Sequence, residues 1–359
     1  MMSKLTLLKR YKLCKHCLER HFGVGSPTNP CYICNGLMDS LDLIANSMLA
    51  AAKDYQFETF LIGATLPAQL YEREDTMRAR LKIRGTENIK NHMTRKLGTR
   101  FAQLTGKSVE YTKPDIRITL TVDKHNDVDI ELISRPLALA GVYTKKSRGL
   151  PQKQDRCTHC AGTGCNYCDY SGLSGCESVE GVIAKEILRL TRGRMPKFTW
   201  IGSEDESSLV LGSGRPFYVR VFNPRKRRLK NVTIRGNGIT AILYAIDGQP
   251  EIQPRFTVKT RIYIRCENTL SKQNLSKLKS LSGSLVSYEN KSKMAEKRIF
   301  SIHVRPIDSH RFTATIVADG GLMIKQFVGG EEYMKPNISE IVGVKCECIT
   351  FDILGVKLQ

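Results

Sequence analysis

The strongest constraint on how this chain can fold comes from its cysteines. The sequence contains 12 cysteines, and eight of them form four Cys-x-x-Cys pairs. In a chain without an export signal, this spacing favours metal binding over disulfides. An all-sulfur set of four thiolates is typical of structural zinc, because it leaves no open position for catalysis. The two expected zinc sets are Cys14, Cys17, Cys31 and Cys34, and Cys157, Cys160, Cys165 and Cys168.

The spacing leaves two questions about these cysteines open. The pairs can combine within each set or across the two sets, and the thiols can instead be free or redox-active. The second set lies in CTHCAGTGCNYCDYSG, where Gly162 and Gly164 supply tight turns that let the backbone approach a metal. Density and spacing together favour structural zinc. The four remaining cysteines are interpreted as packing residues: Cys176, Cys266, Cys346 and Cys348.

The charge of the chain indicates the kind of partner it binds. Its 359 residues include 56 Lys and Arg against 35 Asp and Glu, which gives a net charge of +21 and a pI near 9.5. Residues 1–175 contain 26 basic and 17 acidic residues, and residues 176–359 contain 30 and 18, so both halves are basic. This balance favours a polyanion, nucleic acid above all, in contact with both halves.

Hydrophobic content excludes general disorder and a membrane span. A hydrophobic fraction of 41% supports folded cores, and the length allows two or three domains. The best apolar stretch, residues 41–52, is interrupted by Asp42 and Asn46 and is shorter than the roughly 18 residues of a spanning helix. The apolar run at residues 5–8 has no small-residue cleavage site after it, so no secretory signal is expected. A cytoplasmic protein is expected.

Periodicity predicts helices followed by a hairpin in the amino-terminal half. Residues 41–52 are expected to form a helix capped by Asp39 or Ser40, and a second helix begins near the candidate cap Thr86. Residues 116–122 and 128–132 alternate apolar and polar side chains around a turn-like His-Asn-Asp, which predicts a hairpin. The second helix carries apolar residues at spacing four: Ile89, Met93, Leu97 and Phe101.

Strand signals dominate the carboxy-terminal half. A helix is expected over residues 178–190, and two more over 270–285 and 337–342. The pattern predicts a mixed, mostly antiparallel sheet with helices, so the fold class of the chain is α+β. The expected strands are 198–202, 216–222, 256–266, 298–304, 311–318 and 347–354.

An acidic loop in this basic chain is the most unusual local sequence. Residues 202–228 read GSEDESSLVLGSGRPFYVRVFNPRKRR, with three adjacent acids followed by a Gly-rich turn. A solvated loop is the simpler interpretation. Acids within an RNA-binding surface repel phosphate, however, so they are better tolerated where they act on a base. Gly212, Gly214 and Arg215 are suited to close backbone approach and to recognition of phosphate or carboxylate.

This segment resembles the active-site segment of the archaeal and eukaryotic tRNA pseudouridine synthases that act on the TΨC arm. The family pattern is Gly-Arg-Glu-Asp followed by Leu-Gly-x-Gly-Arg-Pro-Phe and Asn-Pro. The first cysteine set resembles the zinc site of the family, and YTKKSRGLPQ at 143–152 resembles the segment that joins its two domains. Further motifs match along the chain: KTRIY at 259–263, GLMIKQFVGG at 321–330 and KPNI at 335–338.

The resemblance implies a domain plan and a reaction. It implies a zinc-binding segment at 1–36, a THUMP-like RNA-binding domain at 37–152, a second four-cysteine knuckle at 153–175 and a catalytic domain at 176–359. The expected fold is an amino-terminal zinc and THUMP-like α/β domain followed by the sheet of the synthase. The expected reaction is isomerisation of uridine to pseudouridine at position 54, position 55 or both in tRNA, without a cofactor for catalysis.

The resemblance also implies roles for individual residues. Asp205 is expected to act as nucleophile or general base on a uridine flipped out of its stack. Tyr263 is expected to stack on the base, and its simpler interpretation is an ordinary strand aromatic. Lys325 is expected to pair with Asp205 and lower the pKa of that carboxyl group. Arg215 is either a phosphate ligand or an anchor for the loop.

Two departures from the family pattern keep a second function open. The family arginine two places before the catalytic aspartate is Ser203 here, and a substrate-contacting tyrosine corresponds to Met323. They motivate a catalytically degenerate RNA-binding protein or tRNA chaperone as the alternative. A methyltransferase, a thiolation enzyme and a zinc-knuckle chaperone are weaker interpretations. The basic run at residues 225–230 is expected to contact the RNA backbone.

Overall fold

The computed structural model describes residues 11–23, 26–248, 254–290, 293–330 and 333–359. The amino-terminal apolar run at residues 5–8 lies outside the described residues. The chain forms two compact units. The first contains the described residues up to Arg135 together with Asn223–Arg227, and the second contains Pro136–Phe222 and Arg228–Gln359. Within the described part of the chain, no helix is both long enough and apolar enough to cross a membrane.

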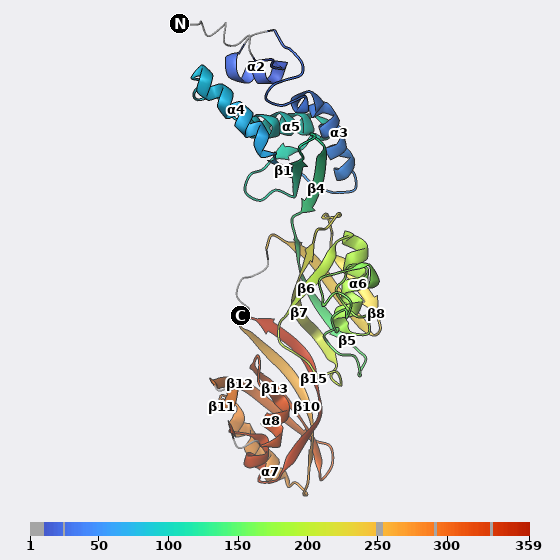
Figure 1. The fold of residues 1–359 in the computed structure, drawn as a ribbon. Coiled ribbons are helices and arrows are strands. Elements are labelled where there is room, and N and C mark those ends of the chain that lie inside the picture. The colour runs from blue at the N-terminus through green and yellow to red at the C-terminus, as the bar shows by residue number, and fades with distance from the viewer. Residues whose placement is uncertain (1–10, 24–25, 249–253, 291–292, 331–332) are drawn as a thin grey trace. The chain divides into compact units, whose positions relative to one another are not determined.

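The first unit packs helices against a four-stranded sheet (Figure 1). Its strand order is β2-β1-β3-β4. Strand β1 runs parallel to β2 and β3, while β3 and β4 are antiparallel and pair Ile116 with Ser134, which confirms the expected hairpin. The strands are β1 (Thr59–Thr65), β2 (Ser108–Val109), β3 (Ile116–Val122) and β4 (Val128–Ser134). The helices are α2 (Lys15–Phe22), η1 (Leu37–Ser40), α3 (Leu41–Ala52), α4 (Ala68–Leu81) and α5 (Ile89–Thr105).

Both helices expected in this unit form, but neither uses its expected cap. A 3-10 turn, η1, precedes α3, and Ser40 makes no side-chain capping bond. Helix α5 is capped by Asn88, whose side chain accepts a hydrogen bond from the amide of Asn91, and not by Thr86. The apolar stripe of α5 is buried as its spacing requires. The buried residues of that stripe are Ile89, Met93, Leu97 and Phe101.

The second unit is built on one large mixed sheet. Its order is β14-β11-β12-β13-β10-β15-β7-β5-β9-β8, with β6 paired to β7. The ladders are antiparallel except between β15 and β7, so the expected mixed, mostly antiparallel sheet is confirmed. The strands are β5 (Leu137–Lys145), β6 (Arg194–Trp200), β7 (Val210–Phe222), β8 (Val232–Gly236), β9 (Ile239–Ile246), β10 (Phe256–Cys266), β11 (Leu285–Asn290), β12 (Lys293–Pro306), β13 (Arg311–Asp319), β14 (Met334–Lys335) and β15 (Cys346–Leu358).

Short helices cover parts of this sheet. Helix α6 packs on β6 and β8 (Figure 1), and its buried residues Val179, Ile183 and Ile187 join the core of the sheet. The helix expected over 270–285 is shorter, because β11 already begins at Leu285. The helices are η2 (Asn166–Cys168), α6 (Val179–Thr191), α7 (Lys272–Lys277), η3 (Leu278–Leu281), α8 (Ile324–Gly329) and α9 (Ile338–Val342).

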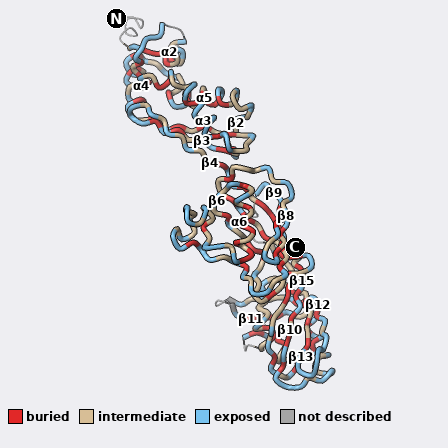
Figure 2. Tube along the Cα trace, turned by 90° about the vertical axis from the view of Figure 1, so that its right-hand side faces the viewer, coloured by how far each residue is buried: buried red, intermediate tan, exposed pale blue. Residues whose placement is uncertain are grey.

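Burial along the strands follows the alternation expected of a sheet. In β13, every second residue from Phe312 to Ala318 is buried. Figure 2 marks the buried residues of both units in red along the trace. Strand β5 pairs with β7 and β9, so residues 137–145 belong to the sheet of the second unit. The sequence predicts that the first domain extends to residue 152, whereas the main segment of the first unit ends at Arg135, before this strand.

Candidate active site and metal centres

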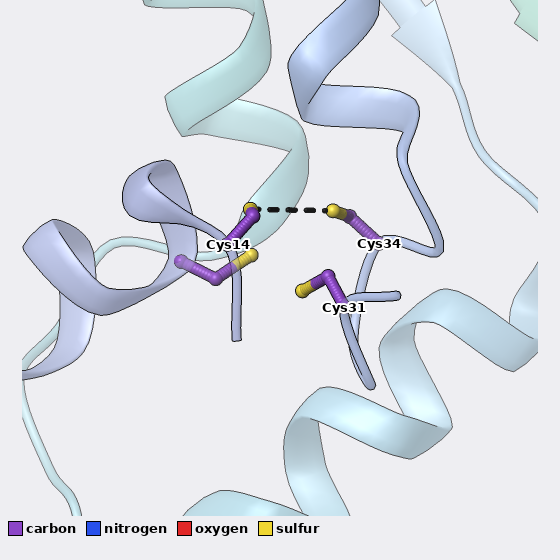
Figure 3. Close-up of side chains that lie close together, drawn as sticks. Cys14, Cys31 and Cys34 are labelled. Carbon is purple, nitrogen blue, oxygen red and sulfur yellow. Dashed lines mark hydrogen bonds between the residues drawn. The ribbon is translucent and has the colours of Figure 1, made fainter. Parts of the chain in front are cut away.

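The first cysteine set forms a compact cluster in the first unit. Its four sulfurs lie within 4.8 Å of one another, and all four residues are buried. Cys14 immediately precedes α2, Cys17 lies in its first turn, and Cys31 and Cys34 come from the loop before η1. The Cys14 and Cys34 sulfurs are 3.6 Å apart and face each other, with Cys31 beside them (Figure 3). The pairs therefore combine within this set.

The second cysteine set forms a knuckle in the second unit that is only partly buried. Its sulfurs again lie within 4.8 Å of one another, with Cys157 to Cys165 at 4.0 Å and Cys160 to Cys168 at 3.9 Å. Backbone amides donate to the sulfurs: Gly164 to Cys160 and Gly172 to Cys168, both at 3.2 Å. Such N–H···S bonds stabilise thiolates and orient metal ligands.

The geometry of both clusters fits a tetrahedral metal. A zinc ion bound to four sulfurs at about 2.3 Å places those sulfurs about 3.8 Å apart. The observed separations of 3.6, 3.8, 3.9 and 4.0 Å lie around that value. Each set could therefore hold one structural zinc ion.

Asp205 lies in the loop between β6 and β7, with its carboxylate held from two sides. One oxygen accepts a hydrogen bond from Nζ of Lys325 at 2.5 Å. The other accepts from the hydroxyl of Ser207 at 2.8 Å and from its amide at 3.1 Å. The bond from Lys325 lowers the pKa of Asp205 to about 2, against the effect of burial and with the help of Ser207. Asp205 is therefore a carboxylate at neutral pH.

A hollow of about 330 Å³ opens in front of this carboxylate. This volume is at the lower end of that of ligand pockets in proteins. Its polar wall comes from the loop and from α8, with Asp205, Lys325 and Gln326. Its apolar wall comes from strands β10, β13 and β15. The apolar lining residues are Phe256, Val258, Ile316, Ala318, Phe351 and Ile353. A polar rim over an apolar floor can accept a flat, partly polar ring such as a base.

The loop that carries Asp205 is held by its backbone from the segment after β5. The fully buried ammonium group of Lys145 donates to the carbonyls of Asp205 and Glu206, both at 3.3 Å. The amide of Gly149 donates to the carbonyl of Glu206 at 2.9 Å. Arg148 donates to the carbonyl of Ser207 at 2.5 Å. Consecutive carbonyls of the loop are thus fixed by side chains and backbone of one short segment.

Strand β15 holds the same loop at its other end. Arg148 makes a two-pronged ion pair with Asp352, at 2.8 and 3.0 Å. Asp352 also accepts a hydrogen bond from the amide of Leu209 at 3.0 Å. Arg148 follows β5 and Asp352 lies in β15, two strands of the same sheet. The loop that they hold therefore has little freedom to move the carboxylate of Asp205.

A buried charged cluster lies behind the loop. The side chain of Glu204 is fully buried, and its carboxylate lies 3.1 Å from the ammonium of Lys145 and 3.7 Å from the guanidinium of Arg215. The hydroxyl of Tyr143 donates to Glu204 at 2.9 Å and accepts from Gln152 at 3.0 Å. Burial raises the pKa of Tyr143 well above its usual value, so its hydroxyl keeps its proton. Two cations thus lie beside one acid inside the protein, and a hydroxyl donates a hydrogen bond to the same carboxylate.

Known proteins resemble this chain over almost its whole length. The family model for the archaeal THUMP domain of Pus10 matches residues 44–121, and the model for the C-terminal part of Pus10 matches residues 138–241 and 253–357, more than half of the chain. A tRNA pseudouridine synthase Pus10 from Nitrosopumilus maritimus is 35% identical, over 98% of this chain and 97% of its own length. The chain belongs to the Pus10 family. The resemblance on which the expected enzyme class rested, an isomerase of the pseudouridine synthase type with a THUMP region, is confirmed.

A second relative and a solved structure are also similar to this chain. The tRNA pseudouridine synthase Pus10 of Cenarchaeum symbiosum is 33% identical, over 97% of this chain and 90% of its own length. Among solved structures, a chain of a Cbf5-Nop10-Gar1 complex matches with a TM-score of 0.32 and 9% identity, over 60% of this chain and 47% of that chain. That structural likeness is too low to carry a conclusion.

The structure brings together some, but not all, of the residues expected to act in this Pus10-family chain. Asp205, Lys325 and Arg215 all line the hollow, as do Ser203 and Met323, which depart from the family pattern. Arg215 is 1% exposed and donates to the carbonyl of Ile201 at 2.9 Å. Of its two expected roles, these contacts are those of an anchor for the loop.

Tyr263 is not among the residues that line the hollow. It lies in β10, where Thr260 points into the hollow and is followed on the same face by the buried Ile262. Alternation along the strand places Tyr263 on the face opposite Thr260 and Ile262. Its cross-strand partner Thr350 donates to the carbonyl of Ser207 in the loop that carries Asp205, so stacking of Tyr263 on a base stays a prediction. Phe256, at the start of the same strand, lines the hollow instead.

The basic run after β7 is also placed differently. Residues Asn223–Arg227 belong to the first unit, where Arg225 lies 3.4 Å from Asp54 and over the ring of Tyr55. Arg227 lies 3.6 Å from Asp115 and is largely buried. These arginines pair with acids of the protein, so the expected contact with the RNA backbone is not supported for them.

Sequence reasoning missed the residues that hold the loop. Lys145, Arg148 and Gln152 all lie in the motif at 143–152, for which the resemblance implies only a joining segment. The sequence did contain one signal for Lys145, because this lysine ends the largely apolar stretch LALAGVYTK. In the structure its side chain is completely buried.

Proposed function

We propose that this protein isomerises uridine to pseudouridine in tRNA, at position 54, position 55 or both in the TΨC arm. Asp205 acts as the nucleophile on a base flipped into the hollow. The observation that carries this proposal is the ionised carboxylate of Asp205, fixed by Lys325 and Ser207 at the mouth of a hollow with an apolar floor. Both the family and the basic charge of the chain support tRNA as the substrate.

The reaction needs no external reactant. The bond between C1′ and N1 of the uridine breaks, the base turns, and C1′ bonds to C5. C5 then loses its proton and N1 gains one, so atoms and charge balance without a redox partner. A carboxylate that stays ionised is suited to stabilise or trap the sugar carbon, and the rigid loop keeps it in place.

The remaining machinery has supporting roles. Lys325 keeps Asp205 ionised, and Arg215 anchors the loop. Met323 and Phe256 offer apolar contacts to the base. We assign docking of the tRNA to the first unit, which contains the THUMP match, and chemistry to the second. Each four-cysteine cluster holds a structural zinc ion, and the enzyme works in the cytoplasm, where its substrate is found.

The test uses an unmodified tRNA transcript. Pseudouridine is mapped by carbodiimide adducts and primer extension after incubation with the wild type, with Asp205→Asn and with Glu206→Ala, which changes a neighbouring exposed acid. We expect stops in the TΨC arm for the wild type and for Glu206→Ala, and none for Asp205→Asn. Efficient modification by Asp205→Asn would exclude Asp205 as the nucleophile.

A second function is tested by the same experiment. Ser203 and Met323 favour a protein of this family that binds tRNA without modifying it. If neither the wild type nor any variant modifies the transcript, while the wild type still binds it, this alternative replaces the first. The ionised Asp205 with Lys325 beside it argues for catalysis.

A further inference from the structure

A second hollow lies beside the catalytic one in the second unit. It has a volume of about 800 Å³ and is bounded by the four-cysteine knuckle on one side and by β6 on the other. The knuckle contributes residues 161–163 and 171–173, and β6 contributes residues 195–198 and Trp200. We call this hollow the knuckle groove. No step of the proposed reaction uses it.

The knuckle groove and the catalytic hollow share two lining residues. Both are lined by Gly202 and Ser203, the two residues that lead into the loop with Asp205. Gly202 has a φ of 79°, and a Cβ there would meet the guanidinium of Arg215 at 2.5 Å. This turn is therefore restricted to glycine, and its two residues form part of the wall of both hollows. A nucleic-acid strand with one nucleotide in the catalytic hollow can therefore reach the groove past Gly202 and Ser203.

The charge of the groove suits a phosphate backbone. Its lining includes three exposed cationic side chains: Lys153, Arg156 and Lys197. Lys153 and Arg156 come from the entry to the knuckle, and Lys197 comes from β6, where its ammonium lies over the ring of Phe222. The three cations are thus presented from both walls.

One acid also lines the groove. Glu180 is half-buried and accepts a hydrogen bond from the amide of Gln154 at 3.1 Å. Burial raises the pKa of Glu180, and the nearby Lys153 and Arg156 partly oppose that rise. Three cations against one tethered acid leave a positive groove.

We propose that the knuckle groove binds the RNA backbone next to the target nucleotide, which makes the second four-cysteine knuckle a positioning element of the catalytic unit. This rests on the proposed function for the identity of the RNA. Contacts to phosphate fix register without reading sequence. Phosphates held by Lys153, Arg156 and Lys197 would set which nucleotide of the strand reaches Asp205.

The first experiment compares two charge reversals in the full chain. One variant carries Lys153→Glu, Arg156→Glu and Lys197→Glu. The matched control carries Lys272→Glu, Lys277→Glu and Lys279→Glu, which change the same charge on α7 and η3, outside both hollows. Affinity for an unmodified tRNA transcript is measured by fluorescence anisotropy over a range of salt concentrations, after zinc content and circular dichroism have shown that both variants are folded.

We expect the groove variant to bind the transcript at least about tenfold more weakly than the wild type. The slope of log K against log salt should become less steep by about two, because three phosphate contacts are lost. The control should lower that slope by less than about one. Equal slopes and equal affinities for the two variants would overturn the proposal.

A second experiment does not depend on altered charge. A photo-crosslinking amino acid is placed at Thr163 in the groove or at Lys277 on α7, and crosslinked nucleotides are mapped by primer extension. We expect crosslinks from residue 163 to nucleotides that flank the modified uridine. Absence of crosslinks at 163 under conditions where the RNA is bound would contradict the proposal.

The two proposals can fail separately. If the wild type makes no pseudouridine but the groove variant loses RNA binding, the groove stands and the proposed reaction falls. If the wild type modifies the transcript and the groove variant does so at the same kcat/KM, the groove proposal falls and the reaction stands.

Discussion

At the scale of single residues, one ion pair determines what the site can do. Asp205 and Lys325 come from two elements, the loop before β7 and helix α8, and they meet at 2.5 Å. The folded-state pKa of Asp205, about 2, lies below its ordinary value of 3.8. Because folding lowers this pKa, the pair stabilises the folded protein above pH 3.8, and that stabilisation is lost as the pH falls toward 2. Titration of Asp205 therefore does not affect activity between about pH 5 and pH 8.

The first prediction concerns Lys325→Met. Removal of the ammonium leaves burial, which raises the pKa of Asp205, opposed only by Ser207. The acid limb of the rate profile should therefore move upward by about one pH unit or more. Single-turnover rates on an unmodified tRNA transcript between about pH 2 and pH 6 measure this shift. Lys325→Arg, which keeps the charge, should retain the wild-type profile, and an unchanged profile in Lys325→Met would contradict the assigned role.

At the scale of elements, the active loop depends on a segment distant in sequence. Lys145, at the end of β5, supplies a buried ammonium to the loop backbone and to the carboxylate of Glu204. Arg148 and Asp352 link the loop to β15. Removal of one partner from such a buried ion pair is far more costly than replacement of both partners by neutral groups.

The second prediction separates stability from positioning at Lys145. Lys145→Met leaves Glu204 without its closest cation, and should lower the free energy of unfolding by about 3–5 kcal/mol. The double variant Lys145→Met with Glu204→Gln should regain most of that loss in urea unfolding. Its kcat should still be about tenfold or more below that of the wild type, because the carbonyls of Asp205 and Glu206 lose their donor. A double variant with full kcat would show that Lys145 is only structural.

The third prediction concerns the two four-cysteine clusters as elements. The first is buried within the core of its unit, whereas three of the four residues in the second are only partly buried. Because zinc binding stabilises a folded site, Cys17→Ser should lower the melting temperature of the protein. Cys160→Ser should lower it less and should mainly weaken tRNA binding, since the knuckle forms one wall of the groove. Zinc content by atomic emission and thermal melts measure both effects; equal melting losses would contradict the distinction.

At the scale of the whole molecule, the chain is divided into a unit that contains the THUMP match and a unit that contains Asp205. The division is not a simple cut in the sequence, because Asn223–Arg227 belongs to the first unit. Gln56 donates its amide to the carbonyl of Arg225 at 2.8 Å, and its side chain accepts from the amide of Arg227 at 3.0 Å. Asn223 accepts a hydrogen bond from the amide of Ser134 at 2.8 Å.

The fourth prediction tests this division through Asp115. Its carboxylate accepts from the amide of Glu58 and pairs with Arg135 and Arg227. Asp115→Ala leaves a largely buried arginine without this partner, and should lower the free energy of unfolding by about 1–3 kcal/mol. Urea unfolding measures the loss. The exposed pair Arg265 with Glu347 provides the control, because Glu347→Ala should change stability by less than about 1 kcal/mol.

The sequence predicted local structure better than long-range contacts. Spacing-four apolar residues identified α5, and alternation identified the β3–β4 hairpin, because both signals are contained in short windows. Motif resemblance identified Asp205 and Lys325, although they lie 120 positions apart in the chain. The hairpin of β8 and β9 was missed, and strand β5 was not predicted either; its partners β7 and β9 lie far along the chain.

The sequence also could not predict which face of the sheet certain strand residues occupy. Tyr263 was expected at the base, and its position in β10 places it on the face opposite Thr260, outside the lining of the hollow. The same limit explains Lys145, which periodicity alone cannot distinguish from a solvated lysine. In both cases, the deciding information is the register with a partner strand, which no short window contains.

The return of Asn223–Arg227 to the first unit has a consequence for how the protein is made. A ribosome delivers the chain from its amino terminus, so residues 11–135 emerge well before their five missing partners. Until residue 227 has left the ribosome, Asp115 lacks Arg227 and the backbone of Gln56 lacks Arg225. By then strands β5, β6 and β7 have also emerged. The first unit therefore reaches its final form only after residue 227 of the 359 has been synthesised and released, although its own sequence is almost entirely contained in the first 135 residues.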